Sequence, residues 1–120
     1  MVRPIHAIAR LLGVALLPLG VAVGCVSPTL PLPPPSTPEV TTVDSAHVSL
    51  SSGCGGVEND AVVEVINTNP TVPMGDAVGG AIATDCGAWS TQVYAHSGDV
   101  LSITQQYANQ TSTPVTVQVP

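Results

Sequence analysis

Beyond residue 43 the chain consists of short segments in which hydrophobic and polar residues alternate, and this period of two is the feature that most constrains the fold. The clearest segments are Val48–Leu50, Ala61–Ile66, Leu101–Tyr107 and Val115–Val119. Alternation places successive side chains on opposite faces of a strand, whereas a helix needs a period near 3.6. Short strands separated by turn residues predict an all-β fold, an antiparallel β-sandwich or barrel, with no long helix after the N-terminal segment.

Two of these segments carry predictions about burial. In 61–66, aliphatic residues stand at Val62 and Ile66 as well as at Val63 and Val65. A strand that is aliphatic on both faces is expected to be covered on both faces. Trp89 is the one Trp in a chain that has no Phe. We expect it to be the largest single piece of the core, and the alternative is an exposed contact for a partner or a sugar.

Charge is distributed unevenly along the chain. Both cations, Arg3 and Arg10, lie in the first ten residues, and all eight acids lie beyond residue 38. A product that keeps only residues 25–120 would carry eight carboxylates and no Lys or Arg, a formal charge of −8. Binding to a phosphate backbone or to anionic lipid headgroups needs cationic side chains, so both are excluded.

The N-terminal segment has the organisation of an export signal. A cationic stretch precedes an apolar run over residues 11–23, which is too short for a spanning helix. The sequence that follows, Ala22-Val23-Gly24-Cys25, resembles the lipobox of bacterial lipoproteins, although that family prefers Leu where Ala22 stands. The resemblance implies that residues 1–24 are a signal peptide and that Cys25 is acylated and anchors the protein in a membrane. The alternative is ordinary cleavage near Gly24, with Cys25 unmodified.

Between the signal and the alternating segments lies a proline-rich stretch. Six of the twelve residues over 27–38 are Pro, which favours extended polyproline II and disfavours helix and sheet. We expect residues 25–43 to form a lipidated tether, in which the extended residues 27–43 hold the domain about 50 Å from the bilayer. A ligand for a proline-binding domain is the alternative. The folded domain is then expected over residues 44–120.

The order of the motifs in that domain resembles bacterial immunoglobulin-like domains. Gly53-Cys54-Gly55-Gly56 leads through an acidic turn into an aliphatic strand, and Asp85-Cys86-Gly87 leads to Trp89. Ser97-Gly98-Asp99 opens a third segment, and Pro114 precedes a closing Val-rich strand. The resemblance implies a small Ig-like antiparallel β-sandwich of the kind that serves as a stalk, spacer or adhesive module on bacterial surfaces, without catalytic activity.

The cysteine count leads to a further prediction. If Cys25 carries lipid, Cys54 and Cys86 remain as an even pair in an exported protein, where disulfides persist. We expect these two residues to form a disulfide, and the family register makes a bridge at one end of the sandwich plausible. Two buried free thiols are the alternative.

Three sets of residues are candidates for a catalytic or metal-binding site. His47 or His96 with Ser97 and Asp99 could form a hydrolase triad, but no nucleophile elbow accompanies them. The candidate zinc ligands are His47, Cys54, Cys86 and His96, and they lack paired ligand spacing. The candidate calcium ligands are the turn acids Asp60, Asp76, Asp85 and Asp99, and they lack a calcium-loop motif. We therefore expect no catalytic residue, no metal and no cofactor.

Together these features predict an exported, lipid-anchored protein of the bacterial cell envelope. Its anchor is the membrane, reached through Cys25, and its domain is expected to bind a protein or glycan of unknown identity or to serve structurally. An accessory lipoprotein of a periplasmic envelope assembly is one alternative. A small secreted enzyme or inhibitor is another. Nucleic acid is not an expected partner.

Overall fold

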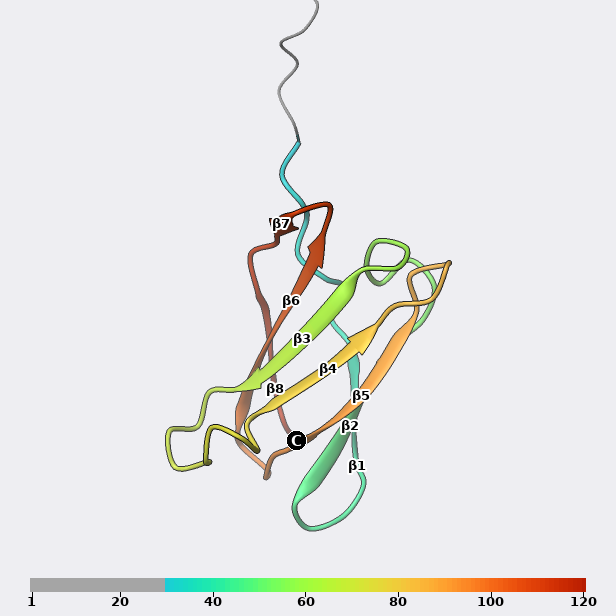
Figure 1. Cartoon of the computed structure of the whole chain (residues 1–120). Coiled ribbons are helices and arrows are strands. Elements are labelled where there is room, and N and C mark those ends of the chain that lie inside the picture. The colour runs from blue at the N-terminus through green and yellow to red at the C-terminus, as the bar shows by residue number, and fades with distance from the viewer. Residues whose placement is uncertain (1–29) are drawn as a thin grey trace, which may run out of the picture. The chain divides into compact units, whose positions relative to one another are not determined.

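The computed structural model describes residues 30–120, and these residues form two antiparallel β-sheets and no helix (Figure 1). The strands are β1 (Glu39–Thr42), β2 (His47–Ser52), β3 (Val62–Asn67), β4 (Val78–Ile82), β5 (Trp89–Tyr94), β6 (Val100–Tyr107), β7 (Gln110–Thr111) and β8 (Val115–Gln118). The first sheet has the order β1-β2-β5, and the second has the order β4-β3-β6-β7, with β8 also paired to β6. The predicted all-β, sandwich-like fold is confirmed. Nothing in residues 30–120 is a helix long and apolar enough to cross a membrane.

The core lies between the inner faces of the two sheets. Leu50 of β2, together with Leu101 and Ile103 of β6, is fully buried, as the alternation predicts. Trp89 is only 4% exposed and belongs to the same hydrophobic cluster. Trp89 is therefore a core residue and not an exposed platform for a sugar.

The prediction that the 61–66 strand is covered on both faces is wrong. Val63 and Val65 are fully buried on the inner face, but Val62 and Ile66 are 46% and 39% exposed on the outer face. The fold has two layers, so the second sheet is covered on its inner face by the first sheet. No element of the described chain packs on its outer face, where Val62 and Ile66 lie. Aliphatic residues on both faces do not by themselves bring a second covering layer.

The expected boundary at residue 44 also needs correction, because the compact unit begins at Pro31. Strand β1 forms over residues 39–42 and pairs with β2, so about two thirds of the expected tether, residues 31–43, belongs to the domain. Pro35 and Pro38 are buried. Proline lacks an amide donor but keeps an apolar ring and a carbonyl acceptor, so a polyproline-like segment can still pack on a domain surface. Residues 25–29 of the tether lie outside the described residues.

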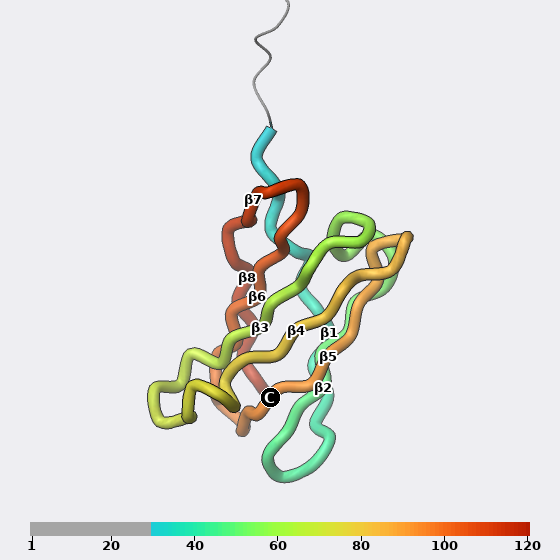
Figure 2. Tube along the Cα trace, viewed as in Figure 1, coloured from blue at the N-terminus to red at the C-terminus, as the bar shows by residue number. Residues whose placement is uncertain are grey.

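Strand β4 is an edge strand of the second sheet and lies next to β5 of the first sheet. It is hydrogen-bonded to β3, and its other edge faces β5, where the Thr91 hydroxyl donates to the carbonyl oxygen of Gly80 at 3.0 Å (Figures 1 and 2). Gly79 makes this approach possible, since a Cβ at that position would stand 2.7 Å from the carbonyl oxygen of Gln92. The free edge of β4 is therefore covered by the neighbouring sheet.

Candidate functional site at the disulfide end

The structure joins Cys54 and Cys86 by a disulfide, with their Cα atoms 4.9 Å apart. Cys54 follows the end of β2, and Cys86 precedes the start of β5. The predicted bridge is therefore present, and it lies at one end of the sandwich. We call this region, formed by loop residues 53–58 and turn residues 84–88, the disulfide end.

Backbone hydrogen bonds bring the two loops of the disulfide end together. The amide of Gly55 donates to the carbonyl of Cys86 at 2.7 Å, and the amide of Val57 donates to the carbonyl of Gly87 at 3.2 Å. Gly87 has a φ of 84°, and a Cβ there would collide with the carbonyl oxygen of Val57. The glycines therefore allow the close approach of the loops, and that approach places the two cysteines within bonding range.

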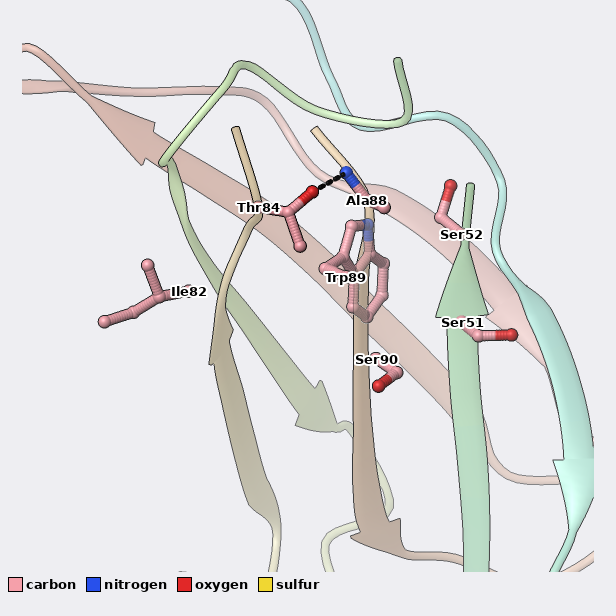
Figure 3. A pocket seen from close by; sticks show the side chains of 7 residues that line it. All are labelled: Ser51, Ser52, Ile82, Thr84, Ala88, Trp89 and Ser90. Carbon is pink, nitrogen blue, oxygen red and sulfur yellow. Dashed lines mark hydrogen bonds between the residues drawn. The ribbon is translucent and has the colours of Figure 1, made fainter. Parts of the chain in front are cut away.

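An open hollow of about 400 Å³ lies beside these loops (Figure 3). Its lining is made of Ser51, Ser52, Ile82, Thr84, Ala88, Trp89 and Ser90. The polar groups on its wall are hydroxyls, and the Thr84 hydroxyl already accepts a hydrogen bond from the amide of Ala88 at 3.2 Å. The lining contains no His, Asp or Glu, so no base is present to activate one of the serines.

The indole of Trp89 contributes one unusual feature to this hollow. Its Nε1 is buried and has no hydrogen-bond partner in the structure. A buried donor without a partner costs about 1–3 kcal/mol, so this N–H is a local weakness of the core. Figure 3 shows the ring between Ile82 on one side and the β2 serines on the other.

A buried glutamine fastens the proline-rich segment to the disulfide end. Gln105 of β6 is 1% exposed; its Oε1 accepts from the amide of Glu58, and its Nε2 donates to the carbonyl of Pro33, both at 2.8 Å. The amide of Ser36 adds a bond of 2.9 Å to the carbonyl of Gly56. Sequence reasoning missed Gln105, although its place in the inward series after Leu101 and Ile103 was a signal that it is buried.

At the opposite end of the strands, the carboxylate of Asp99 connects separate segments of the chain through hydrogen bonds. Asp99 is 9% exposed and accepts hydrogen bonds of 2.9 Å from the side-chain amides of Asn67 and Asn69 and from the backbone amide of His96. The Asn67 amide, followed by the His96 amide, holds the pKa of Asp99 below its ordinary value of 3.8, while burial opposes the shift. We call this region, residues 67–69 and 95–99, the far end.

The residues of the candidate triad are part of this scaffold. Asp99 is engaged by the amide of His96, and His96 lies edge-on against the Tyr94 ring at a centroid distance of 5.0 Å. His47 also lies edge-on to the Tyr94 ring, at a centroid distance of 5.9 Å, and its Nδ1 is 3.1 Å from the carboxylate of Asp44. Hydrogen bonds from the Ala46 amide and from His47 lower the pKa of Asp44. No hydrogen bond in residues 30–120 links the Ser97 hydroxyl to either imidazole.

The candidate metal ligands are also dispersed. His96 lies at the far end and His47 lies opposite Tyr94 next to it, whereas Cys54 and Cys86 are joined to each other at the disulfide end. In the part of the chain that the structure describes, no three His, Cys, Asp or Glu side chains lie close enough to hold a metal ion. The turn acids Asp60, Asp76 and Asp85 do not converge with Asp99.

Cys25, the predicted lipid-attachment residue, lies outside the described residues. No family model matches the chain, and no curated protein matches it.

Proposed function

We propose that this chain is an exported lipoprotein of the bacterial cell envelope, anchored through Cys25, that displays one Ig-like domain for binding or structural support. The observation that carries the proposal is the Cys54–Cys86 disulfide. It accounts for two of the three cysteines and fits an oxidising compartment, and only Gly24 separates the third cysteine from the apolar run of the signal-like segment.

The Ig-like assignment is supported by the two antiparallel sheets of the sandwich. In a constant-type immunoglobulin domain the fourth strand belongs to the sheet of the first two strands. Here β4 pairs with β3 in the other sheet, and its second edge approaches β5. The domain is proposed to be Ig-like with its fourth strand shifted between sheets, which the small residues Gly79 and Gly80 permit.

Because part of the proline segment is docked on the domain, the free tether between Cys25 and the domain is shorter than expected. Six Cα-to-Cα steps separate Cys25 from Pro31, where the compact unit begins. At about 3.5 Å per step these residues span at most about 20 Å. A lipid on Cys25 would thus hold the domain within about 20 Å of the bilayer, less than half of the reach expected from a free tether over 27–43.

The test compares the full chain with a Cys25→Ala variant in a bacterial host that carries lipoprotein-processing enzymes. Wild-type protein should partition into detergent, incorporate radiolabelled palmitate and begin at residue 25. The variant should do none of these. Cys86→Ala is the matched control, because it removes a cysteine of the disulfide and should leave the lipid in place. Palmitate incorporation that survives in Cys25→Ala would overturn the assignment.

Surface labelling separates display from the alternative of a periplasmic accessory role. An impermeant biotin reagent or a protease added to intact cells should reach a displayed domain. Protection in intact cells, with exposure after the outer envelope is opened, would favour the accessory role and leave the lipid assignment unchanged.

A further inference from the structure

The outer face of β3 and β4 carries an apolar patch. The register places Val62 opposite Ile82 and Ile66 opposite Val78, and residues directly opposite in an antiparallel pair project from the same face. Val78 and Ile82 are 48% and 74% exposed, in addition to the exposed Val62 and Ile66. We call these four residues the aliphatic patch. β3 and β4 lie side by side (Figures 1 and 2).

Such a patch is unusual for a solvent-facing sheet. An antiparallel sheet with one wet face normally alternates between buried apolar residues and polar residues on the wet face. Strand β6 follows this rule, with the half-buried Ser102 and Thr104 on this same outer face. On β3 and β4 the wet face is itself aliphatic. Contiguous exposed apolar surface marks an interaction site more often than it marks a free surface.

A single carboxylate lies at the centre of the patch. Glu64 stands between Val62 and Ile66 on β3, and its partner across the register on β4 is Gly80. Because Gly80 has no side chain, one flank of Glu64 is left open to an incoming group. Its partner on the other side is the neutral Thr104.

Residues 30–120 contain no Lys or Arg that could pair with Glu64, since Arg3 and Arg10 are the two such residues of the sequence. When another protein covers the aliphatic patch, Glu64 is buried with it. An unpaired buried charge is strongly unfavourable, so the carboxylate then needs a positively charged partner. A covering surface must therefore bring its own positive charge. A second copy of this domain brings another carboxylate and more acidic surface, so it does not meet this need.

We propose that the aliphatic patch and Glu64 bind a partner protein that presents a Lys or Arg side chain flanked by aliphatic residues. The charged head pairs with Glu64 through the gap at Gly80, and the flanking residues cover the aliphatic patch. This inference rests on the proposed function in one respect: the partner is met outside the cytoplasm.

The test places a photoreactive amino acid at position 82 of the full-length protein in the cells that make it. Irradiation should give an adduct whose crosslinked peptide contains a Lys or Arg among aliphatic residues. Glu64→Lys should reduce the adduct at least tenfold, and Glu64→Gln should reduce it less. The matched control is Glu39→Lys, on the exposed face of β1 in the other sheet, which should leave the yield unchanged. A probe at Gln92 of β5 should give no such adduct.

The decisive step is a charge exchange. Replacing the crosslinked partner's Lys or Arg with Glu should abolish the adduct with wild type and restore it with Glu64→Lys. No adduct at position 82, an adduct with lipid, an adduct between two copies of this chain, or a yield indifferent to Glu64→Lys would each overturn the inference. Lipid attachment is tested separately with Cys25→Ala, and surface exposure with the labelling of intact cells, so a negative result here leaves the proposed function unchanged.

Discussion

The two ends of the sandwich are closed by different chemistry. The disulfide end is held by the covalent bond between Cys54 and Cys86 and by the neutral amide of Gln105. The far end is held by the carboxylate of Asp99 and its amide donors. A disulfide acts largely by restricting the unfolded chain, whereas the Asp99 network acts only in the folded state and needs an ionised carboxylate. One end therefore responds to redox conditions and the other to acid.

The largest expected effect comes from breaking the covalent end. Replacing both cysteines, Cys54→Ser with Cys86→Ser, should lower the free energy of unfolding by about 3–4 kcal/mol, because the closed loop no longer restricts the denatured ensemble. Urea denaturation of the variant and of oxidised wild type measures the difference. Reduced wild type should match the variant. A decrease in the free energy of unfolding of less than about 1 kcal/mol would show that the disulfide is not a main source of stability.

Removing the carboxylate of the far end should have the next largest effect. Asp99→Ala leaves the Asn69 amide and the His96 N–H without their acceptor, and the Asn67 amide keeps only the Tyr94 carbonyl. A loss of about 2–3 kcal/mol is therefore expected. Asp85→Ala is the matched control at the disulfide end, where the side chain is exposed, and it should change stability by less than about 0.5 kcal/mol. Equal losses of stability in the two variants would show that the hydrogen bonds of Asp99 stabilise the fold no more than an exposed carboxylate does.

Gln105→Met tests the neutral fastening of the disulfide end. Met keeps much of the volume but makes neither the bond to Glu58 nor the bond to Pro33, so about 1–2 kcal/mol should be lost. Hydrogen exchange at Ser36 should rise in the variant, since the proline segment loses one of its attachments. Unchanged exchange would mean that the buried rings of Pro35 and Pro38 hold the segment on their own.

Acid should weaken the far end selectively. The pKa of Asp99 is lowered in the folded state, so its stabilisation is fully present above the unfolded pKa of about 3.9 and is lost as the pH falls through the folded pKa. Stability of wild type should therefore fall more steeply below pH 4 than stability of Asp99→Asn. Asp44, whose pKa is also lowered, is common to both proteins and cancels in the comparison. Identical slopes in urea midpoint against pH would contradict this prediction.

Trp89→Phe should have the smallest effect. The substitution removes some buried area but also removes the indole N–H that has no partner, and the two contributions oppose each other. We expect the free energy of unfolding to change by less than about 1 kcal/mol, against about 3 kcal/mol for the fully buried control Leu50→Ala. A loss above about 2 kcal/mol would indicate that Nε1 has a partner in solution.

The sequence predicted those features of the fold that depend on neighbouring residues. Alternation identified the inward residues of β2 and β6, and counting cysteines identified the Cys54–Cys86 pair. Asp99 was recognised as a turn residue, but its bonds to Asn67 and Asn69 span about thirty residues of sequence, and no local signal encodes them. The exposed Val62 and Ile66 were misjudged for a related reason, because whether a second face is covered depends on the number of layers.

The proline segment shows a different limit. Its composition predicts an extended backbone, and extended backbone is equally compatible with a free spacer and with a strand that docks. What decides between them is a set of acceptors and donors on other elements, Gln105 and Gly56 among them. These residues lie far from the segment in sequence, so composition alone placed the boundary some thirteen residues too late.

The disulfide also has a mechanical consequence. The described chain enters near β7 and ends beyond β8 at the opposite end of the sandwich, so a pull between these points runs along the strands (Figure 1). The bond spans a separation of 32 residues, which is about 110 Å of contour length at about 3.5 Å per residue. In a force experiment the oxidised domain should therefore extend by about 110 Å less than the reduced one. Redox state would set how far this domain can stretch once its sheets have parted.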